Sequence, residues 1–151
     1  MAALSKETIE LVNHLIETCK DGQEGYRSAA ADVTDAGLKE LLSQYEQQRA
    51  NFAAELQRTV VALGESDPCN HSSMTGDLHR AWINVRSAFT NREDRAVLLE
   101  CERGEDYAVK AYREALAFPD LAEELRPVLT RQATAVEQAH EAIRARCGSE
   151  A

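Results

Sequence analysis

The pattern of apolar and polar residues predicts a chain built from long amphipathic helices. Over most of its length, apolar residues recur at intervals of three and four, which places their side chains on one face of a helix. The four longest segments of this kind span about residues 5–33, 36–63, 92–117 and 120–146. Helices that each carry one apolar stripe bury these stripes against one another, so the pattern is typical of a four-helix bundle.

Several residues mark where the predicted helices begin and end. Asp35 is placed to cap the second helix, and Gly64 is placed to end it. Thr90 and Glu93 have the spacing of a capping box at the start of the third helix. Pro127 lies inside the fourth predicted helix, where its ring and missing N–H group disturb the backbone. We therefore expect a kink or a broken first turn there.

The connector between the second and third long helices, residues 64–92, indicates the topology. It begins as a loop rich in Ser, Asp, Asn and Pro, and a short helix is predicted over residues 77–89. A hairpin between neighbouring helices needs only a few residues, whereas this segment can run the length of a bundle. We therefore predict an all-α, ferritin-like bundle with one long crossover, in which Cys19 and Cys101 lie on opposite sides of the bundle centre.

Composition and charge exclude several classes of protein. The 151 residues suffice for one domain with a core that needs no metal or disulfide. The formal net charge of -9 argues against binding to nucleic acid or to anionic membranes, which both require Lys and Arg. No apolar run approaches the ~20 residues of a membrane span, and no signal-peptide pattern is present, so we expect a cytoplasmic protein. The four scattered cysteines indicate reduced thiols.

One polar residue interrupts the apolar stripe of each long helix. These residues are Gln23, Arg49, Glu105 and Gln132. When the helices are aligned by their connecting turns, all four lie near the middle of the bundle. We therefore predict a buried polar layer, in which a guanidinium beside a carboxylate is balanced in charge and two amides complete the hydrogen bonds.

This predicted layer differs from the metal sites of ferritin-like di-metal proteins. Those sites take a carboxylate from each of two helices and an E-x-x-H motif from each of the other two. Here Gln23 replaces a carboxylate, and Glu46-x-x-Arg49 replaces one histidine with a cation. Glu137-x-x-His140 has the spacing of the motif, but Glu137 points away from the apolar stripe. We therefore expect Arg49 to occupy the place of a metal, and we expect no cofactor.

A metal-binding alternative stays open at this point. If the arginine moved aside, Glu46, Glu102 and Glu105 would form a carboxylate site for iron or manganese, with His140 beside it. Such a site would store iron or support ferroxidase or peroxide-reducing activity.

Three glycines inside the predicted helices flank the layer: Gly22, Gly25 and Gly104. Each weakens a helix by about 1 kcal/mol relative to Ala, so their presence implies a compensating gain. We expect them to make room for tyrosines at the same level. In the crossover segment we expect Trp82 to form a hydrophobic lid, while His79 is a candidate switch or ligand. A small-molecule pocket beneath this segment is a third possibility.

The motifs in combination resemble those of a known family. They are Asp21-Gly22-x-x-Gly25-Tyr26, Arg49-x-x-Phe52-x-x-Glu55-Leu56, His79-Arg80-x-Trp82, Glu102-Arg103-Gly104-Glu105-Asp106, Gln132 and His140. The chain resembles a bacterial ferritin-like four-helix-bundle family of unknown function (domain of unknown function 2383). The resemblance implies a ferritin-like bundle with no established activity, and Tyr26 stands where such proteins more often have Phe. Arg49 is one of the residues on which this resemblance rests.

Together these features favour a single-domain bundle without a working di-iron site over the metal-binding enzyme of the alternative. We expect a stress-related or structural interaction protein that self-associates through its helix faces. Its protein partner is not predicted.

Overall fold

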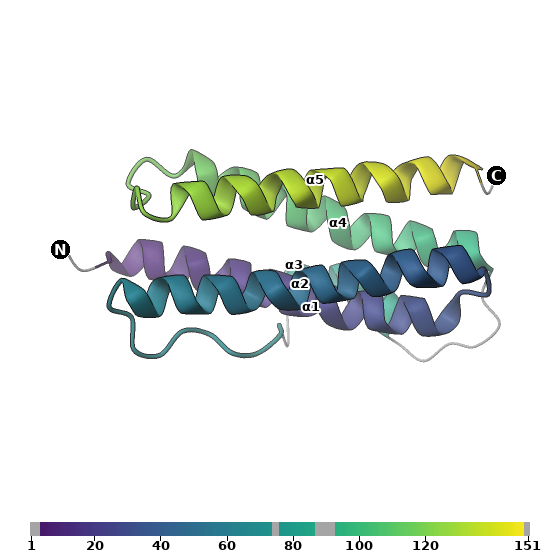
Figure 1. Cartoon of the computed structure of the whole chain (residues 1–151), viewed down its shortest axis with the longest axis horizontal. Helices are drawn as coiled ribbons and strands as arrows, with labels where there is room; N and C mark the ends of the chain where they lie inside the picture. Colours follow the sequence, from purple (N-terminus) through teal and green to yellow (C-terminus); the bar gives the residue numbers. More distant parts are fainter. Residues whose placement is uncertain (1–3, 74–75, 87–92, 150–151) are drawn as a thin grey trace.

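The computed structural model describes residues 4–73, 76–86 and 93–149, which form helices joined by turns and loops with no strand among them. The helices are α1 (Lys6–Asp32), α2 (Ala36–Ala62), α3 (Gly76–Arg86), α4 (Asp94–Ala117) and α5 (Arg126–Ser149). The four long helices lie side by side as an elongated bundle, and α3 is the short additional helix (Figure 1).

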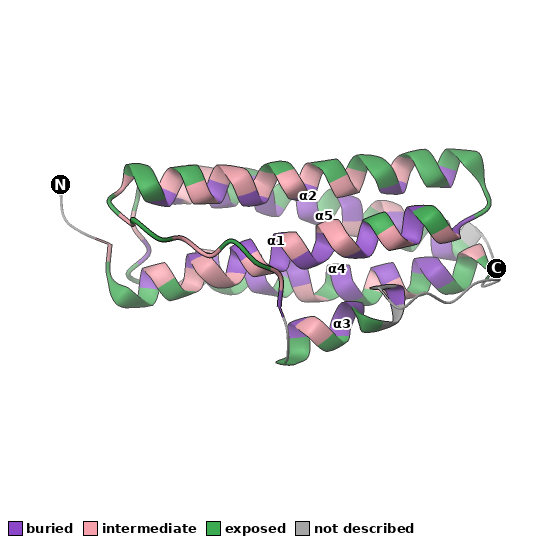
Figure 2. Cartoon of the chain, turned by 90° about the horizontal axis from the view of Figure 1, so that it is seen from below, coloured by how far each residue is buried: buried purple, intermediate pink, exposed green. Residues whose placement is uncertain are grey.

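The order and direction of the helices confirm the ferritin-like topology. Helices α1 and α5 run in one direction along the bundle, and α2 and α4 run in the other (Figure 1). After α2 the chain turns back along the bundle and leads to α3, which packs against α1 and α4 (Figure 2). This path is the predicted crossover, and it excludes the simple up-down-up-down alternative.

Hydrogen bonds to α1 and α2 hold the loop of this crossover in place. The backbone N–H of Cys69 donates to the side chain of Asn13 at 2.9 Å, and its carbonyl accepts from Gln57 at 2.9 Å. Farther along the loop, the buried carboxylate of Asp21 accepts hydrogen bonds from the backbone N–H of Ser73, at 2.8 Å, and from its hydroxyl. The crossover is therefore tied to the bundle before α3 begins.

The helix ends follow from their capping residues. The Asp35 side chain accepts from the N–H of Leu38 at 2.8 Å and so caps α2. Gly64 has a φ of +107°, and the next N–H donates back to the carbonyl of Val60, which is a Schellman ending. Glu93 precedes α4, but its side chain makes no capping hydrogen bond. Its predicted capping partner, residue 90, and the predicted end of the crossover helix lie outside the described residues.

Helix α5 begins at Arg126, six residues later than the sequence predicts. The preceding residues form turns that still bury Leu121 and Leu125 in the core. Pro127 therefore lies in the first turn of the helix, where its missing N–H group breaks no hydrogen bond. The predicted helix is therefore interrupted before Pro127, because residues 120–125 are not α-helical, and this agrees with the expected break.

The core consists of two apolar clusters, one in each half of the bundle. The first contains Cys19 together with Leu56 and Leu129, and the second contains Cys101 together with Leu42. Figure 2 shows buried residues along the inward faces of all the helices. Among the described helices, none combines the length and the hydrophobicity needed to cross a membrane.

Candidate functional site

An ion pair between Arg49 of α2 and Glu105 of α4 lies inside the bundle. Arg49 is 1% exposed and Glu105 is 0% exposed. The guanidinium donates from Nη1 to Oε1 at 2.5 Å and from Nη2 to Oε2 at 2.9 Å. This two-point geometry is the strongest form of an arginine–carboxylate contact, and it occupies both carboxylate oxygens. We call these two residues the central ion pair.

Neighbouring side chains complete the hydrogen bonds of the central ion pair. The hydroxyl of Tyr26 donates to Oε1 of Glu105, and the Tyr26 ring lies 5.4 Å from the Arg49 guanidinium carbon. The third guanidinium nitrogen, Nε of Arg49, donates to the side-chain oxygen of Gln48 at 3.2 Å. Gly22 leaves room for the arginine, since a Cβ atom there would lie 3.3 Å from its Cγ and Nη1 atoms.

The protonation states of Arg49 and Tyr26 are fixed over the ordinary pH range. Burial acts to lower the pKa of Arg49, but the charge of Glu105, the neighbouring Tyr26 and the hydrogen bonding to Glu105 together outweigh burial and raise it. Burial, reinforced by the charge of Glu105, raises the pKa of Tyr26 well above its usual value. The arginine therefore stays a cation and the tyrosine stays a hydrogen-bond donor.

The prediction that Gln23 belongs to the buried layer is wrong. Its side chain is partly exposed and faces a surface groove shared with Lys20 and His71. Successive residues of a helix are about 100° apart, and the structure turns Gly22, not Gln23, toward Arg49. Helix α1 contributes its polar group through Tyr26, a residue that the sequence suggested only as a large side chain.

Gln132 is fully buried as predicted, but it belongs to a second hydrogen-bond network. Its oxygen accepts from the hydroxyl of Tyr112 at 2.7 Å, and its nitrogen donates to Glu55 at 2.8 Å. Tyr112 also contacts the thiol of Cys19 at 3.1 Å. Burial raises the pKa of that thiol to about 11, so it stays protonated. The predicted layer is thus two networks, one around Arg49 and one around Gln132.

Trp82 of α3 fills a notch between α1 and α4. A Cβ atom at Gly25 or at Gly104 would lie 2.1 Å from the indole ring, which is closer than any real contact. The indole is fully buried, and its ring packs edge-on against Tyr26 at a centroid distance of 5.2 Å. These two glycines therefore make room for Trp82 and not for tyrosines, which corrects the expectation. His79, on the same helix, is half-buried and has no hydrogen-bond partner for its Nδ1 atom among the described residues.

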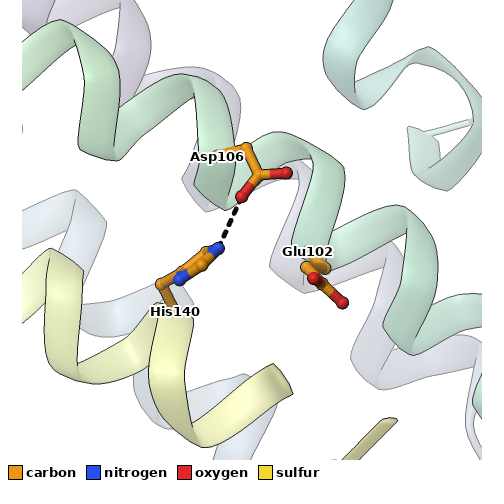
Figure 3. A group of neighbouring side chains, drawn as sticks. All are labelled: Glu102, Asp106 and His140. Carbon is orange, nitrogen blue, oxygen red and sulfur yellow. Dashed lines mark hydrogen bonds and ion pairs between the residues drawn. The ribbon is translucent and has the colours of Figure 1, made fainter.

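The four residues of the predicted metal-binding alternative do not come together. Glu46 pairs with Arg27 at 2.8 Å near the surface, and Glu105 is bound to Arg49 in the interior. Glu102 and His140 do lie close to one another, on the outer side of α4 and α5 (Figure 3).

Comparisons with known proteins agree with this architecture. A family model described as a domain of unknown function (DUF2383) matches residues 7–117. The chain belongs to this DUF2383 family. Among solved structures, it is similar to the tetragonal form of Dps from Mycobacterium smegmatis, with a TM-score of 0.68 and 17% sequence identity over 97% of this chain and 91% of that one. No curated protein matches it significantly.

In this member of the DUF2383 family, the centre of the bundle does not fit a di-metal site of the ferritin-like kind. Among the described residues, the fully buried carboxylates are Asp21, which binds Ser73, and Glu105, which binds Arg49. A di-metal site needs several carboxylates and imidazoles facing one another, whereas a guanidinium holds both oxygens of Glu105. The chemistry available at the centre is that of a fixed ion pair.

Proposed function

We propose that this chain is a structural or interaction protein that uses the ferritin-like bundle without di-iron chemistry. The stress-related role expected from the sequence is part of this proposal. The observation that carries it is the two-point contact of Arg49 with Glu105 inside the bundle. The carboxylate that would bind a metal there is already neutralised by a cation of the protein itself.

The energetics of the central ion pair support this proposal. Before Glu105 could bind a metal, Arg49 would have to leave a buried site and its hydrogen bonds. Breaking a buried pair from one side costs about 3–5 kcal/mol, because it leaves an uncompensated charge. Along the chain, α2 and α4 are connected by the long crossover and α3, so a directional contact between the two helices would fix their register. We infer that this is what the pair does.

Self-association through the helix faces is part of the same proposal. Among the described residues, large apolar side chains are exposed on three different helices: Val61 of α2, Ile83 of α3 and Leu99 of α4. Light scattering coupled to size-exclusion chromatography gives the oligomeric state directly, and we expect a species larger than the monomer. A monomer at every concentration would remove this part of the proposal.

The proposal is tested by measuring iron binding and Fe²⁺ oxidation in the wild-type protein and in Glu105→Gln. Purified protein is incubated with Fe²⁺ without oxygen and passed through a desalting column, and the bound iron is measured. Oxidation of Fe²⁺ after addition of air is then compared among wild type, Glu105→Gln and protein-free buffer. We expect the same oxidation rate in all three, with no iron that depends on Glu105.

A rate increase in wild type that Glu105→Gln abolishes would overturn the proposal. If that variant does not fold, the comparison between wild type and buffer decides alone. An oxidation rate above that of the buffer would then count against the proposal.

A further inference from the structure

Three side chains of the types that bind metals gather between α4 and α5, where they are half-buried or exposed, whereas the central ion pair is buried. They are Glu102 and Asp106 of α4 and His140 of α5 (Figure 3). One ligand atom from each lies within 4.8 Å of the other two. Nε2 of His140 and Oδ1 of Asp106 are 2.5 Å apart, and Glu102 lies one helical turn before Asp106. We call this group the α4–α5 cluster.

The fold holds the α4–α5 cluster in place. Residues four apart on a helix share a face, so Glu102 and Asp106 both point toward α5. The side chain of His140 is 15% exposed, which leaves its ring largely held by its surroundings, whereas that of Asp106 is 64% exposed. A ligand would therefore meet one ordered imidazole and a carboxylate that is free to adjust.

The donor set indicates the class of ligand. One imidazole nitrogen and two carboxylate oxygens suit a divalent transition-metal ion, and the two negative charges balance its charge. Around Zn²⁺, with bonds of about 2.0–2.2 Å, tetrahedral donors lie roughly 3.3–3.6 Å apart. The 2.5 Å contact between His140 and Asp106 is shorter than these separations, and the exposed carboxylate of Asp106 has the freedom to move outward when an ion binds. A fourth position on the ion would then face solvent.

We propose that the α4–α5 cluster binds one divalent transition-metal ion, with Zn²⁺ as the best match, through His140, Asp106 and Glu102. The site lies between the outer faces of two helices and is separate from the bundle centre, where Arg49 binds Glu105. It does not depend on the proposed function, because a structural protein can carry a metal at its surface.

Direct titration tests this proposal. Metal-free protein, prepared with a chelator, is titrated with Zn²⁺ by calorimetry, and the thermal unfolding temperature is measured with and without the ion. We expect one ion per chain and a rise in unfolding temperature, because the ion binds the folded state. His140→Ala and Asp106→Asn should each weaken binding by at least about tenfold and remove the thermal shift. Mg²⁺ should bind much more weakly, since it prefers oxygen ligands.

His71→Ala is the matched control for His140→Ala. His71 is also a surface histidine near a carboxylate, with its Nδ1 atom 3.9 Å from Glu17, but it does not belong to the cluster. This variant should bind Zn²⁺ as wild type does. Absorption of bound Co²⁺ gives a second readout, because its visible bands report the ligands and would change in Asp106→Asn even where the fold is intact.

Two results would overturn the proposal: no stoichiometric binding by wild type, or equal binding by wild type, His140→Ala and Asp106→Asn. Glu105→Gln separates this proposal from the previous one. Loss of Zn²⁺ binding in Glu105→Gln alone would place the ion at the bundle centre and contradict both proposals. Loss of binding only in the cluster variants leaves the proposed function standing.

Discussion

Arg49 shows how one charged residue can belong to the interior of a protein. Its guanidinium makes two hydrogen bonds to Glu105 and a third to Gln48, and it lies against the ring of Tyr26. Each of the three guanidinium nitrogens thereby donates at least one hydrogen bond to a neighbouring side chain. A buried pair of this kind contributes less to net stability than its geometry suggests, because two charges have lost their water.

The energetic asymmetry of the central ion pair leads to a prediction. Arg49→Met leaves a carboxylate buried without its cation, so we expect the free energy of unfolding to fall by about 3–5 kcal/mol. The double variant Arg49→Met/Glu105→Leu removes both charges and should recover most of this loss. Urea unfolding followed by circular dichroism measures both.

Arg27→Met is the control for this pair of variants. Its partner is Glu46 at the surface, and the Arg27 side chain is 62% exposed, so solvent screens the interaction. We expect a change of about 0–1 kcal/mol. The account would be contradicted if the loss in free energy of unfolding of Arg49→Met/Glu105→Leu equalled the sum of the losses of Arg49→Met and Glu105→Leu.

At the scale of the helices, the packing of α3 depends on the absence of a side chain at two positions of its neighbours. Its Trp82 ring occupies space that is vacant because Gly25 and Gly104 lack side chains. A short helix alone is marginal in water, so α3 depends on this docking for its stability. The two glycines weaken α1 and α4 and are compensated by the burial of a whole indole.

Substitution of these glycines tests the docking of α3. Gly25→Ala and Gly104→Ala each place a methyl group 2.1 Å from the indole ring of Trp82. Because the ring must shift to relieve this overlap, we expect a loss of about 1–3 kcal/mol in the free energy of unfolding. Gly37→Ala, in the first turn of α2, has its nearest atom at 3.4 Å and should be neutral or slightly stabilising. If all three variants behaved alike, the notch would not be the reason for the glycines.

The start of α4 is attached to the turn between α1 and α2 by one carboxylate. Asp94 accepts hydrogen bonds from the backbone N–H groups of Thr34 at 2.8 Å and Asp35 at 3.0 Å. Burial acts to raise the pKa of Asp94, but these hydrogen bonds outweigh burial and lower it. A carboxyl group whose pKa is lower in the folded state than in the unfolded state stabilises the fold fully at pH values above its unfolded-state pKa. This stabilisation is lost as the pH falls through the folded-state pKa.

We therefore expect Asp94→Asn to reduce stability near neutral pH and to change it less in acid. The measurement is the urea midpoint from pH 7 down to about pH 3, below the usual pKa of an aspartate. Asp120→Asn, an exposed carboxylate in the turn before α5, serves as control and should follow wild type. A constant difference between Asp94→Asn and wild type at all pH values would argue against the hydrogen-bonded carboxylate as the cause.

At the scale of the whole molecule, the architecture follows from the sequence because two signals agree. The spacing of apolar residues defines the long helices, and the length of the connector requires a crossover. Cys19 and Cys101 lie in different halves of the core, as the crossover topology predicts. The late start of α5 was missed because Leu121 and Leu125 keep helical spacing in a segment that forms turns.

The candidate site was less accessible to sequence reasoning. The spacing of apolar residues in α1 does not distinguish neighbouring positions at the edge of the stripe. The sequence therefore predicts that Gln23 faces the arginine, whereas Gly22 does so in the structure. The notch for Trp82 involves three helices, and no spacing within one helix shows it. Asp106 is absent from the predicted metal ligands, because its proximity to His140 depends on how α4 packs on α5.

The whole molecule should unfold as one cooperative unit that includes α3. Trp82 is the single tryptophan of the chain, and it is fully buried. Its fluorescence should therefore change at the same urea concentration as the circular dichroism signal of the helices. An earlier fluorescence transition would mean that α3 separates from a bundle that is still folded.

The fit of one indole between two helix backbones also constrains how such sequences diverge. A relative that replaces this aromatic residue with a small one gains empty volume at both glycine positions, and alanine would then fill that volume and favour the helices. Positions 25, 82 and 104 should consequently covary across homologues: a large residue at position 82 should accompany glycine at positions 25 and 104.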